Sequence, residues 1–419
     1  MDMEWKEYKL GDLITFKSGG TPSKSNETFW GGTIPWVSAK NMYTDFISTS
    51  TMFITEEGLK SGSQLAPIGS ILLLTRGSGL FNTIPICLVT SPVAYNQDVK
   101  CIFTKNDSII SNEFLFYWMI SNKAKFVEIL ETTGIGAGKI ATDRLLDISI
   151  LVPPMIEQVR LLNVAKSILG KIENNNKINA KLEEMAQALF KSWFIDFEPF
   201  KVGRDGSRPA FGSGNFVESE LGMIPEGWKV GKIEDLAERI ASGGTPKSMN
   251  ESYYKGDIQW YSTKELKDCF LRDSEKHISQ EAYDNSSTKF FDKGTVLMAI
   301  YAAPTVGRLG VLTQKACFNQ AAVGIAPKNE VGSYFIYWLL YSERNNLNNL
   351  ASGAAQQNLN VGIVKSYPCI LPKESVLAEY NEIISPIMDL IMSNSIENDN
   401  LAKTRDTLLP KLMSGEIEL

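Results

Sequence analysis

The chain has a single histidine, His277, and five widely separated cysteines among 419 residues. One histidine cannot furnish an H-N-H nuclease site or a zinc site built from several histidines. The cysteines form no C-x-x-C pair and are odd in number, which favours reduced thiols over a disulfide framework or a structural metal. No apolar run approaches the length of a membrane span, and the N-terminus lacks an apolar signal core. We therefore expect a cytoplasmic protein that binds no metal.

The sequence also lacks a convincing catalytic constellation. The loop GIGAGKI resembles a phosphate-binding loop, but Thr133 stands where that motif needs glycine and Ile140 where it needs serine or threonine. No N/D-P-P-Y methyltransferase motif and no cluster of metal-binding carboxylates is present. We expect no catalytic residue in this chain and no cofactor bound to it.

The net charge of −6 does not mark a nucleic-acid-binding protein. The acidity is concentrated in residues 374–419, which carry 9 acidic and 3 basic side chains, while the rest of the chain is close to neutral. Any affinity for DNA must therefore come from local clusters, or from partner subunits that supply phosphate contacts.

Two halves of the sequence repeat one plan. The segments that begin at Trp5 and Trp228 share SGGTP, an Asn-Glu pair, an aromatic pair and W-x-S-x-K. Further along, AYNQ corresponds to CFNQ and FYW to IYW, and each half closes with a Gly-rich loop, a short strand and a long helix. The sequence therefore predicts two domains with the same fold.

Short β-branched segments bounded by turns predict strands in both halves. These segments are 71–75, 84–90, 99–103, 295–300, 308–313 and 321–325. Apolar patterns with helical spacing predict helices over 113–133 and 333–352. We expect each domain to be a compact α+β fold with a curved sheet.

Apolar residues recur every seven positions along two rows after each domain, which is the pattern of a helix that packs on another helix. The first helix has rows Leu161, Ile168, Asn175, Leu182, Leu189 and Ala165, Ile172, Asn179, Ala186, Trp193. Adding 219 to each number gives the second helix, with rows Tyr380, Ile387, Asn394, Leu401, Leu408 and Ile384, Ile391, Asn398, Arg405, Leu412.

An antiparallel pairing of these helices would place Asn175 against Asn398 and Asn179 against Asn394. Buried asparagines fix register, because another polar group must satisfy them. About 40 residues at 1.5 Å each give a spacer of about 60 Å. We expect a break in the second helix before Pro386, because proline suits the first turn of a new helix.

The predicted architecture is α+β, with two similar domains separated by an antiparallel two-helix coiled-coil spacer and related by a pseudo-twofold axis. The predicted boundaries are 1–154 for the first domain, 155–200 for the central helix, 201–227 for a linker, 228–373 for the second domain and 374–419 for the C-terminal helix.

Polar side chains in Gly-rich loops are the candidates for DNA contact, because such groups read base edges and bind phosphates. The candidates are Lys40, Arg76, Lys139, Arg144, Lys264, Arg308, Gln356, Gln357 and Asn358. Equivalent loops carry different donors in the two halves, which would read different sequences. The alternative is that these are ordinary turns and surface charges. The unchanged pairs Asn96-Gln97 and Asn319-Gln320 favour a structural role, as buried amides usually have.

With these motifs the chain resembles the specificity (S) subunit of type I restriction–modification systems over essentially its whole length. The resemblance rests on the doubled SGGTP and W-x-S-x-K, on the helix start P-P-x-x-E-Q-x-R at residues 153–160, and on LEEMAQALFKSWFIDFEPF at 182–200. The second junction, LPKESVLAEY, departs from the E-Q-x-R pattern.

The resemblance implies a subunit without catalytic activity that reads a bipartite DNA target, one domain per half-site. It implies two methyltransferase partners that methylate adenine with S-adenosylmethionine, and restriction subunits that use ATP and Mg²⁺. Two alternatives stay open: a methylation-only or type IIG-like system, and a scaffold that binds proteins but no DNA. A free-standing nuclease is disfavoured by the lack of acidic metal ligands.

Overall fold

The computed structural model describes residues 4–134, 136–203, 206–301, 305–350 and 359–418. The chain forms two compact units, and each takes half of each long helix. Unit 1 comprises Met1–Asn174 with Asn398–Leu419, and unit 2 comprises Asn175–Glu397. Both units mix helices and sheets, so the α+β class predicted from the sequence is confirmed.

Unit 1 is built on four small sheets, and the strands of each are named in their spatial order. The five-stranded sheet contains β2 (Ile14–Ser18), β11 (Val99–Thr104), β7 (Ile71–Leu74), β9 (Ile86–Val89) and β4 (Phe46–Ile47). The four-stranded sheet contains β5 (Phe53–Ile54), β3 (Trp30–Val37), β10 (Val93–Tyr95) and β6 (Gln64–Ala66). The three-stranded sheet contains β12 (Leu130–Thr132), β13 (Gly138–Ile140) and β8 (Arg76–Gly77). The two-stranded sheet pairs β1 (Lys6–Lys9) with β14 (Ser149–Val152). Its short helices are α1 (Leu10–Leu13), α2 (Glu56–Lys60), α3 (Asn112–Ser121), α4 (Lys123–Glu128) and α5 (Thr142–Leu146).

Unit 2 repeats this plan. Its five-stranded sheet contains β18 (Ala237–Ser242), β25 (Ala322–Pro327), β22 (Val296–Ala299), β23 (Leu309–Leu312) and β20 (Cys269–Leu271). The three-stranded sheet contains β21 (Lys276–Ile278), β19 (Ile258–Tyr261) and β24 (Cys317–Phe318). The two-stranded sheets pair β17 (Lys229–Lys232) with β26 (Pro368–Leu371), and β15 (Phe216–Ser219) with β16 (Gly222–Pro225). Its short helices are α7 (Gln280–Asp284), α8 (Ser333–Ser342), α9 (Arg344–Asn349) and α10 (Val361–Ser366).

The two five-stranded sheets share one topology. In both, four neighbouring strands pair antiparallel and the last strand pairs parallel, β4 with β9 and β20 with β23. Each unit also has one parallel pair in its second sheet, β3 with β10 and β19 with β24. The predicted duplication is therefore confirmed at the level of strand order and direction.

The predicted helix over 113–133 is too long. The structure has α3, then α4, which ends at Glu128, and Leu130–Thr132 forms strand β12. The side chain of Asn122 donates to the carbonyl of Trp118 at 2.9 Å and closes α3. The apolar residues of 129–132 are compatible with a strand as well as with a helix. Residues Leu130–Thr132 form a strand because they pair with β13.

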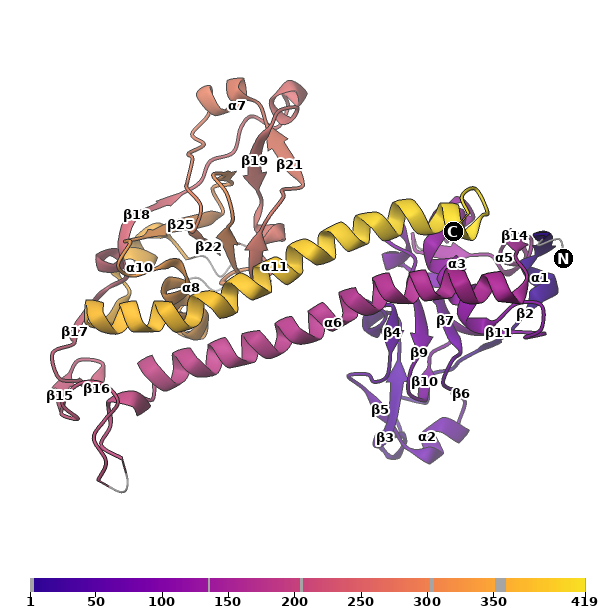
Figure 1. Ribbon diagram of the computed structural model, residues 1–419, viewed down its shortest axis with the longest axis horizontal. Coiled ribbons are helices and arrows are strands. Elements are labelled where there is room, and N and C mark those ends of the chain that lie inside the picture. Colours follow the sequence, from indigo (N-terminus) through magenta and orange to yellow (C-terminus); the bar gives the residue numbers. More distant parts are fainter. Residues whose placement is uncertain (1–3, 135, 204–205, 302–304, 351–358, 419) are drawn as a thin grey trace. The chain divides into compact units, whose positions relative to one another are not determined.

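The long helices α6 (Met155–Phe194) and α11 (Glu374–Met413) lie side by side and run antiparallel within each unit (Figure 1). In unit 1 the two helices pack together against α3 and bury one shared set of apolar side chains. From α6 and α11 this set includes Leu161, Ala165, Ile168, Leu169, Leu409, Leu412 and Met413. Each helix therefore supplies part of the core of the domain beside it.

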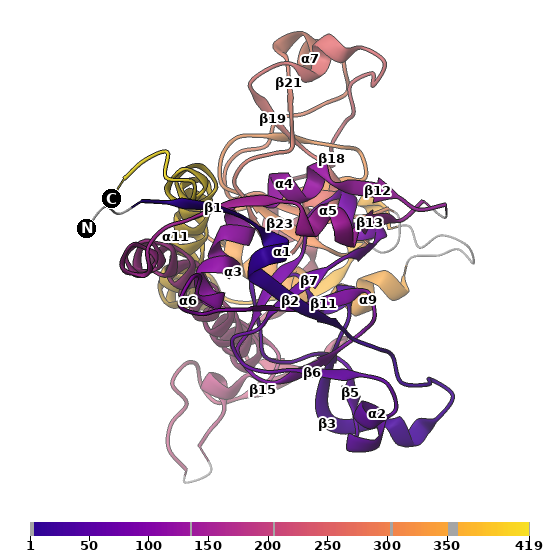
Figure 2. The same cartoon turned by 90° about the vertical axis from the view of Figure 1, so that its right-hand side faces the viewer.

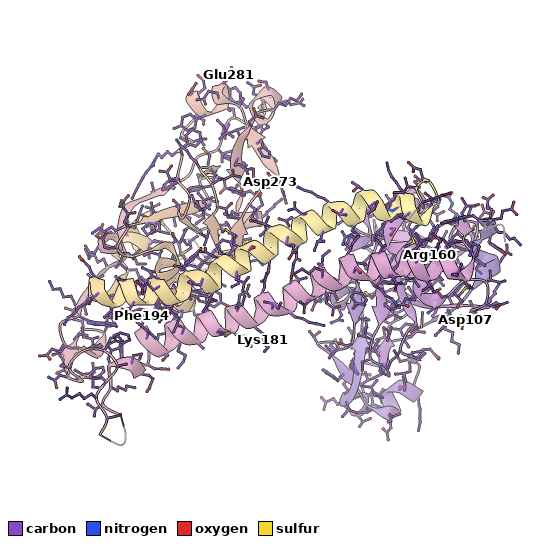
Figure 3. All side chains as sticks on the ribbon, in the orientation of Figure 1. Asp107, Arg160, Lys181, Phe194, Asp273 and Glu281 are labelled. Atoms are coloured by element: carbon purple, nitrogen blue, oxygen red, sulfur yellow. The ribbon has the colours of Figure 1, made fainter. Side chains whose placement is uncertain are left out.

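Unit 2 closes its core in the same way, with a larger share of aromatic residues. Phe194, at the end of α6 (Figure 3), has its ring centroid 4.8 Å from that of Tyr380 and 4.9 Å from that of Phe335. Both neighbouring rings meet it edge-on, the arrangement that aromatic quadrupoles favour. Tyr380 is fully buried, so α11 is anchored to α6 and to α8 at this point.

Helix α11 is continuous from Glu374 to Met413, so the predicted break before Pro386 is wrong. Ile384 and Met388 are both buried in the core of unit 2, one on each side of the proline. Pro386 itself lies on the partly exposed face, where water can satisfy the carbonyl that loses its partner. Packing on both sides of Pro386 therefore keeps the helix in one piece.

The segment 201–227, predicted as a linker, contains regular structure and residues that pack on the core of unit 2. It contains the hairpin of β15 and β16. The ring of Phe211 packs in a tilted orientation against that of Trp193, with centroids 4.9 Å apart. Ile224 is buried in the core of unit 2. The sequence did not predict these core contacts, because the Gly and Ser residues around Phe211 and Ile224 are typical of loops.

The asparagine pair in unit 2 fixes the register of the long helices. Asn394 Nδ2 donates to Asn179 Oδ1 at 2.8 Å, and Asn179 Nδ2 lies 3.3 Å from Ser395 Oγ. Asn175 Nδ2 donates to Glu397 at 2.8 Å. Its predicted partner Asn398 belongs to unit 1.

Replacing Asn179 with alanine should lower the free energy of unfolding by about 1–3 kcal/mol, because Asn394 loses its buried acceptor. The double variant Asn179→Leu, Asn394→Leu should recover that loss, since both polar groups are removed together. Urea unfolding measures both, with exposed Gln187→Ala as a control of unchanged stability. A double variant no more stable than the single one would contradict this account.

Candidate functional site

The motifs shared by the two halves come together at one place in each unit. Trp36 of W-x-S-x-K is buried and its Nε1 donates to the carbonyl of Gly20 in SGGTP at 3.1 Å. Trp260 makes the same bond to Gly244 at 2.9 Å. The tryptophan therefore pins the SGGTP loop to the neighbouring sheet in both units.

Glycine is required in this loop because other backbone approaches it closely. A Cβ on Gly20 would lie 1.7 Å from the carbonyl oxygen of Gly62, and one on Gly243 would lie 2.0 Å from that of Phe318. Such distances exclude any side chain without a shift of the backbone. The two glycines of SGGTP are thus structural.

The threonine that follows these glycines makes the same contact in both units. Thr21 Oγ1 donates to Gln97 Oε1 at 2.6 Å, and Thr245 Oγ1 donates to Gln320 Oε1. Asn96, by contrast, is buried and holds a turn through Asp98. The structural role inferred for the Asn-Gln pairs therefore suits Asn96, whereas neither glutamine is buried.

Lys40 and Lys264 occupy equivalent exposed positions just after a strand. Lys40 lies in a single 3₁₀ turn, Ala39–Asn41, and Lys264 in another, Thr263–Glu265. A capping box fixes each turn, with Ser38 and Asn41 in unit 1 and Ser262 and Glu265 in unit 2. Both lysines therefore project from a rigid support.

The candidates Arg76, Lys139 and Arg144 gather on the small sheet of β12, β13 and β8. Lys139 pairs with Arg76 on one side and with Glu131 on the other, so all three side chains share one face of the sheet. Arg144 reaches the same group, since its Nε lies 3.3 Å from Glu131 Oε1. The structure thus brings together three positive charges and one carboxylate, the last of which the sequence did not point to.

Arg308 stands at the start of β23 and is partly exposed. Its backbone N–H donates to the carbonyl of Thr305 at 3.0 Å, which closes the turn before the strand. Gln356, Gln357 and Asn358 lie outside the described residues. Of the unit 2 candidates that correspond to Arg76, Lys139 and Arg144, the described residues therefore include Arg308.

Among the described residues, burial is the main cause of the large pKa shifts of the cysteines. Burial raises the pKa of Cys87, Cys317 and Cys369 to about 12, so these thiols stay protonated near neutral pH. Among the described residues, no three His, Cys, Asp or Glu side chains gather as a metal site would require. Within the same residues, no helix combines the length and the apolar character needed to cross a lipid bilayer.

The turn that carries Lys40 follows β3, a strand of the sheet β5, β3, β10 and β6. This sheet and α2 form the end of unit 1 away from α3 and α6 (Figure 2). Two copies of one domain whose loops differ in sequence are the arrangement expected of a protein that recognises two different targets.

Comparison with known proteins identifies the class. The family model described as "Type I restriction modification DNA specificity domain" matches residues 3–184 and 225–403. The chain is 27% identical to the type I restriction enzyme MjaIX specificity subunit of Methanocaldococcus jannaschii, over 99% of this chain and 94% of that one. It is 27% identical to the HindI specificity subunit of Haemophilus influenzae, over 75% and 80%.

The fold also matches the crystal structure of a type I restriction–modification S subunit from M. genitalium. The TM-score is 0.59 at 13% identity, covering 98% of this chain and 96% of that one. The chain belongs to the family of type I restriction–modification specificity subunits, as its motifs suggested. It is the DNA sequence-specificity subunit of such a system and a non-catalytic component of the complex.

Replacing Gly20 with alanine should destabilise unit 1 by about 3 kcal/mol, because the new methyl group overlaps the backbone of Gly62. Gly79→Ala in the same unit is the matched control, since its Cβ would meet nothing within 4 Å. Urea unfolding of both variants measures the difference. Equal stabilities would show that the loop is free to move away.

Proposed function

We propose that the chain recognises a bipartite DNA target, with one unit for each half-site. The observation that carries this proposal is the structural duplication. Both units have the same strand order, the same tryptophan–glycine bond and the same threonine–glutamine bond. Two equivalent supports with different loops suit a target with two different short sequences.

In unit 1 the face shared by Arg76 and Lys139 is the proposed reading surface. An arginine can bind guanine through two hydrogen bonds in the major groove, and lysine can bind guanine or a phosphate. Glu131 balances part of this charge and holds Arg144 in place. In unit 2 the proposed readers are Gln356, Gln357 and Asn358, since such amides pair with adenine.

The paired long helices are the proposed spacer between the half-sites and the docking surface for partners. The apolar side chains that are more than a third exposed on their unit 2 halves include two pairs, which are candidate contacts for a partner. The pairs are Ile178 and Met185 of α6 and Ile383 and Leu390 of α11. In each pair the residues are seven positions apart, so each pair forms a stripe along one helix face.

The proposed partners are two methyltransferase subunits, which use S-adenosylmethionine to methylate adenine. Restriction subunits that use ATP and Mg²⁺ join the complex for cleavage. A cytoplasmic location follows from this role, because the DNA of the cell lies there. A complex of the chain with methyltransferase should protect a split site in a footprint, and a scaffold that binds no DNA would give no footprint.

Replacing Arg76 with alanine should relax recognition at one half-site and leave the other unchanged. The loss of a bidentate arginine–guanine contact corresponds to about 5- to 150-fold in discrimination. Sequencing of methylated adenines in DNA treated with the reconstituted complex measures both half-sites at once. Arg208→Ala, an exposed arginine outside the sheets, serves as the control. Equal relaxation of both halves would contradict the assignment of unit 1 to one half-site.

Removing residues 168–174 of α6 together with 399–405 of α11 should shorten the gap between the half-sites. Seven residues correspond to about 10 Å of helix, or about three base pairs of DNA. Removing a heptad from both helices keeps their apolar stripes in phase. Methylation mapping reads the new gap directly, and an unchanged gap would refute the spacer role.

A further inference from the structure

A group of polar residues at the surface, which we call the Thr–Gln edge, occurs in both units. It consists of Thr21, Lys40 and Gln97 in unit 1, and of Thr245, Lys264 and Gln320 in unit 2. The sequence motifs SGGTP, W-x-S-x-K and Asn-Gln each contribute to it, although none was predicted to meet another.

The strand topology explains why these residues meet. β3 pairs parallel with β10, and β19 pairs parallel with β24. The carboxyl ends of parallel neighbours lie at one edge of a sheet, and there the chain continues into Lys40 and Gln97, or into Lys264 and Gln320. A backbone bond continues each pair beyond the strands, from Asn96 N to Val37 O at 3.0 Å and from Asn319 N to Tyr261 O at 2.9 Å.

The threonine fixes which end of the glutamine amide faces outward. Its hydroxyl donates to Oε1, so the amino group Nε2 is the end left for another partner. Neither Gln97 Nε2 nor Gln320 Nε2 has an acceptor among the described residues. Holding a surface glutamine in one rotamer costs side-chain entropy, yet both units do so. The result is a pre-oriented hydrogen-bond donor.

The outward-facing groups of this edge are donors and cations. Each unit presents one amide amino group and one equivalent lysine, Lys40 or Lys264, at the surface. The neighbouring carboxylate of Asp98 accepts from Asn96 Nδ2 at 3.2 Å, and that of Glu265 accepts from the backbone of Ser262 at 2.7 Å. A hydrogen-bond donor beside a cation suits an anion with several oxygens.

We propose that the Thr–Gln edge binds the phosphate backbone of DNA, in the same manner at both half-sites. This inference rests on the proposed bipartite recognition. Surface chemistry that is identical in two units cannot encode two different sequences, whereas the backbone they meet is the same. Gln97 and Gln320 are therefore positioning residues that set each unit on the duplex, and the other loops read the bases.

The test uses the full-length chain reconstituted with its methyltransferase subunits. Gln97→Glu keeps an oxygen that accepts from Thr21 and exchanges the amino group for a second carboxylate oxygen. A structural role predicts no effect, because the threonine bond survives. A phosphate contact predicts binding at least about tenfold weaker, the effect of losing a hydrogen bond to a charged group. Gln320→Glu should give a similar loss.

The probes are a duplex that carries the methylation-mapped site, its single-base variants and a scrambled duplex. Gln97→Glu should lower the affinity for all of these duplexes by the same factor, so the ratios between their affinities stay unchanged. Lys40→Ala should reduce the dependence of log affinity on log salt by about one. Lys6→Ala, which removes an exposed charge on β1, is the control, and urea midpoints confirm that every variant is folded.

Two results would overturn the inference. One is unchanged affinity for Gln97→Glu on every probe, and the other is a loss confined to a single base pair, which would make the glutamine a base reader. Failure of the wild-type complex to prefer its mapped site over the scrambled duplex would instead refute the proposed function. The phosphate contact is still measured in that case, because it acts on non-specific DNA as well.

Discussion

The structure depends on the antiparallel packing of α6 on α11. Each unit completes its core with a half of both helices, so neither long helix is an appendage. Burial of Ala165 and Leu412 in unit 1, and of Phe194 and Tyr380 in unit 2, couples the helices to the sheets. Within unit 2 the polar pair Asn179–Asn394 selects one register among those that apolar stripes alone would permit.

This arrangement separates support from recognition. The bonds that recur in both units, from Trp36 to Gly20 and from Trp260 to Gly244, hold the loops in fixed positions. The loops attached to that support differ, as Lys139 on its three-stranded sheet illustrates. A rigid support with variable loops is how many binding folds change their target without changing their core.

Much of this organisation could be predicted from the sequence, since it follows from the heptad spacing of apolar residues and from the motifs repeated in the two halves. Strands such as β7 and β22 are continuous apolar runs bounded by turns, and the heptad rows identify the buried face of α6. What the sequence could not provide is contact between distant segments. The sequence did not predict that Glu131 lies opposite Lys139 or that Thr21 binds Gln97. Both contacts depend on which strands pair, and the local sequence does not specify that pairing. The break expected before Pro386 failed for the same reason, since tertiary packing outweighs a local preference.

The division of the chain also has a consequence for synthesis on the ribosome. Unit 1 draws part of its core, Leu409, Leu412 and Met413, from a segment that follows unit 2 in the sequence. Residues 1–174 therefore emerge, and unit 2 is translated in full, before unit 1 can close its hydrophobic interior. Until that segment of α11 emerges, the first domain exposes the apolar surface that Leu409, Leu412 and Met413 cover in the folded protein.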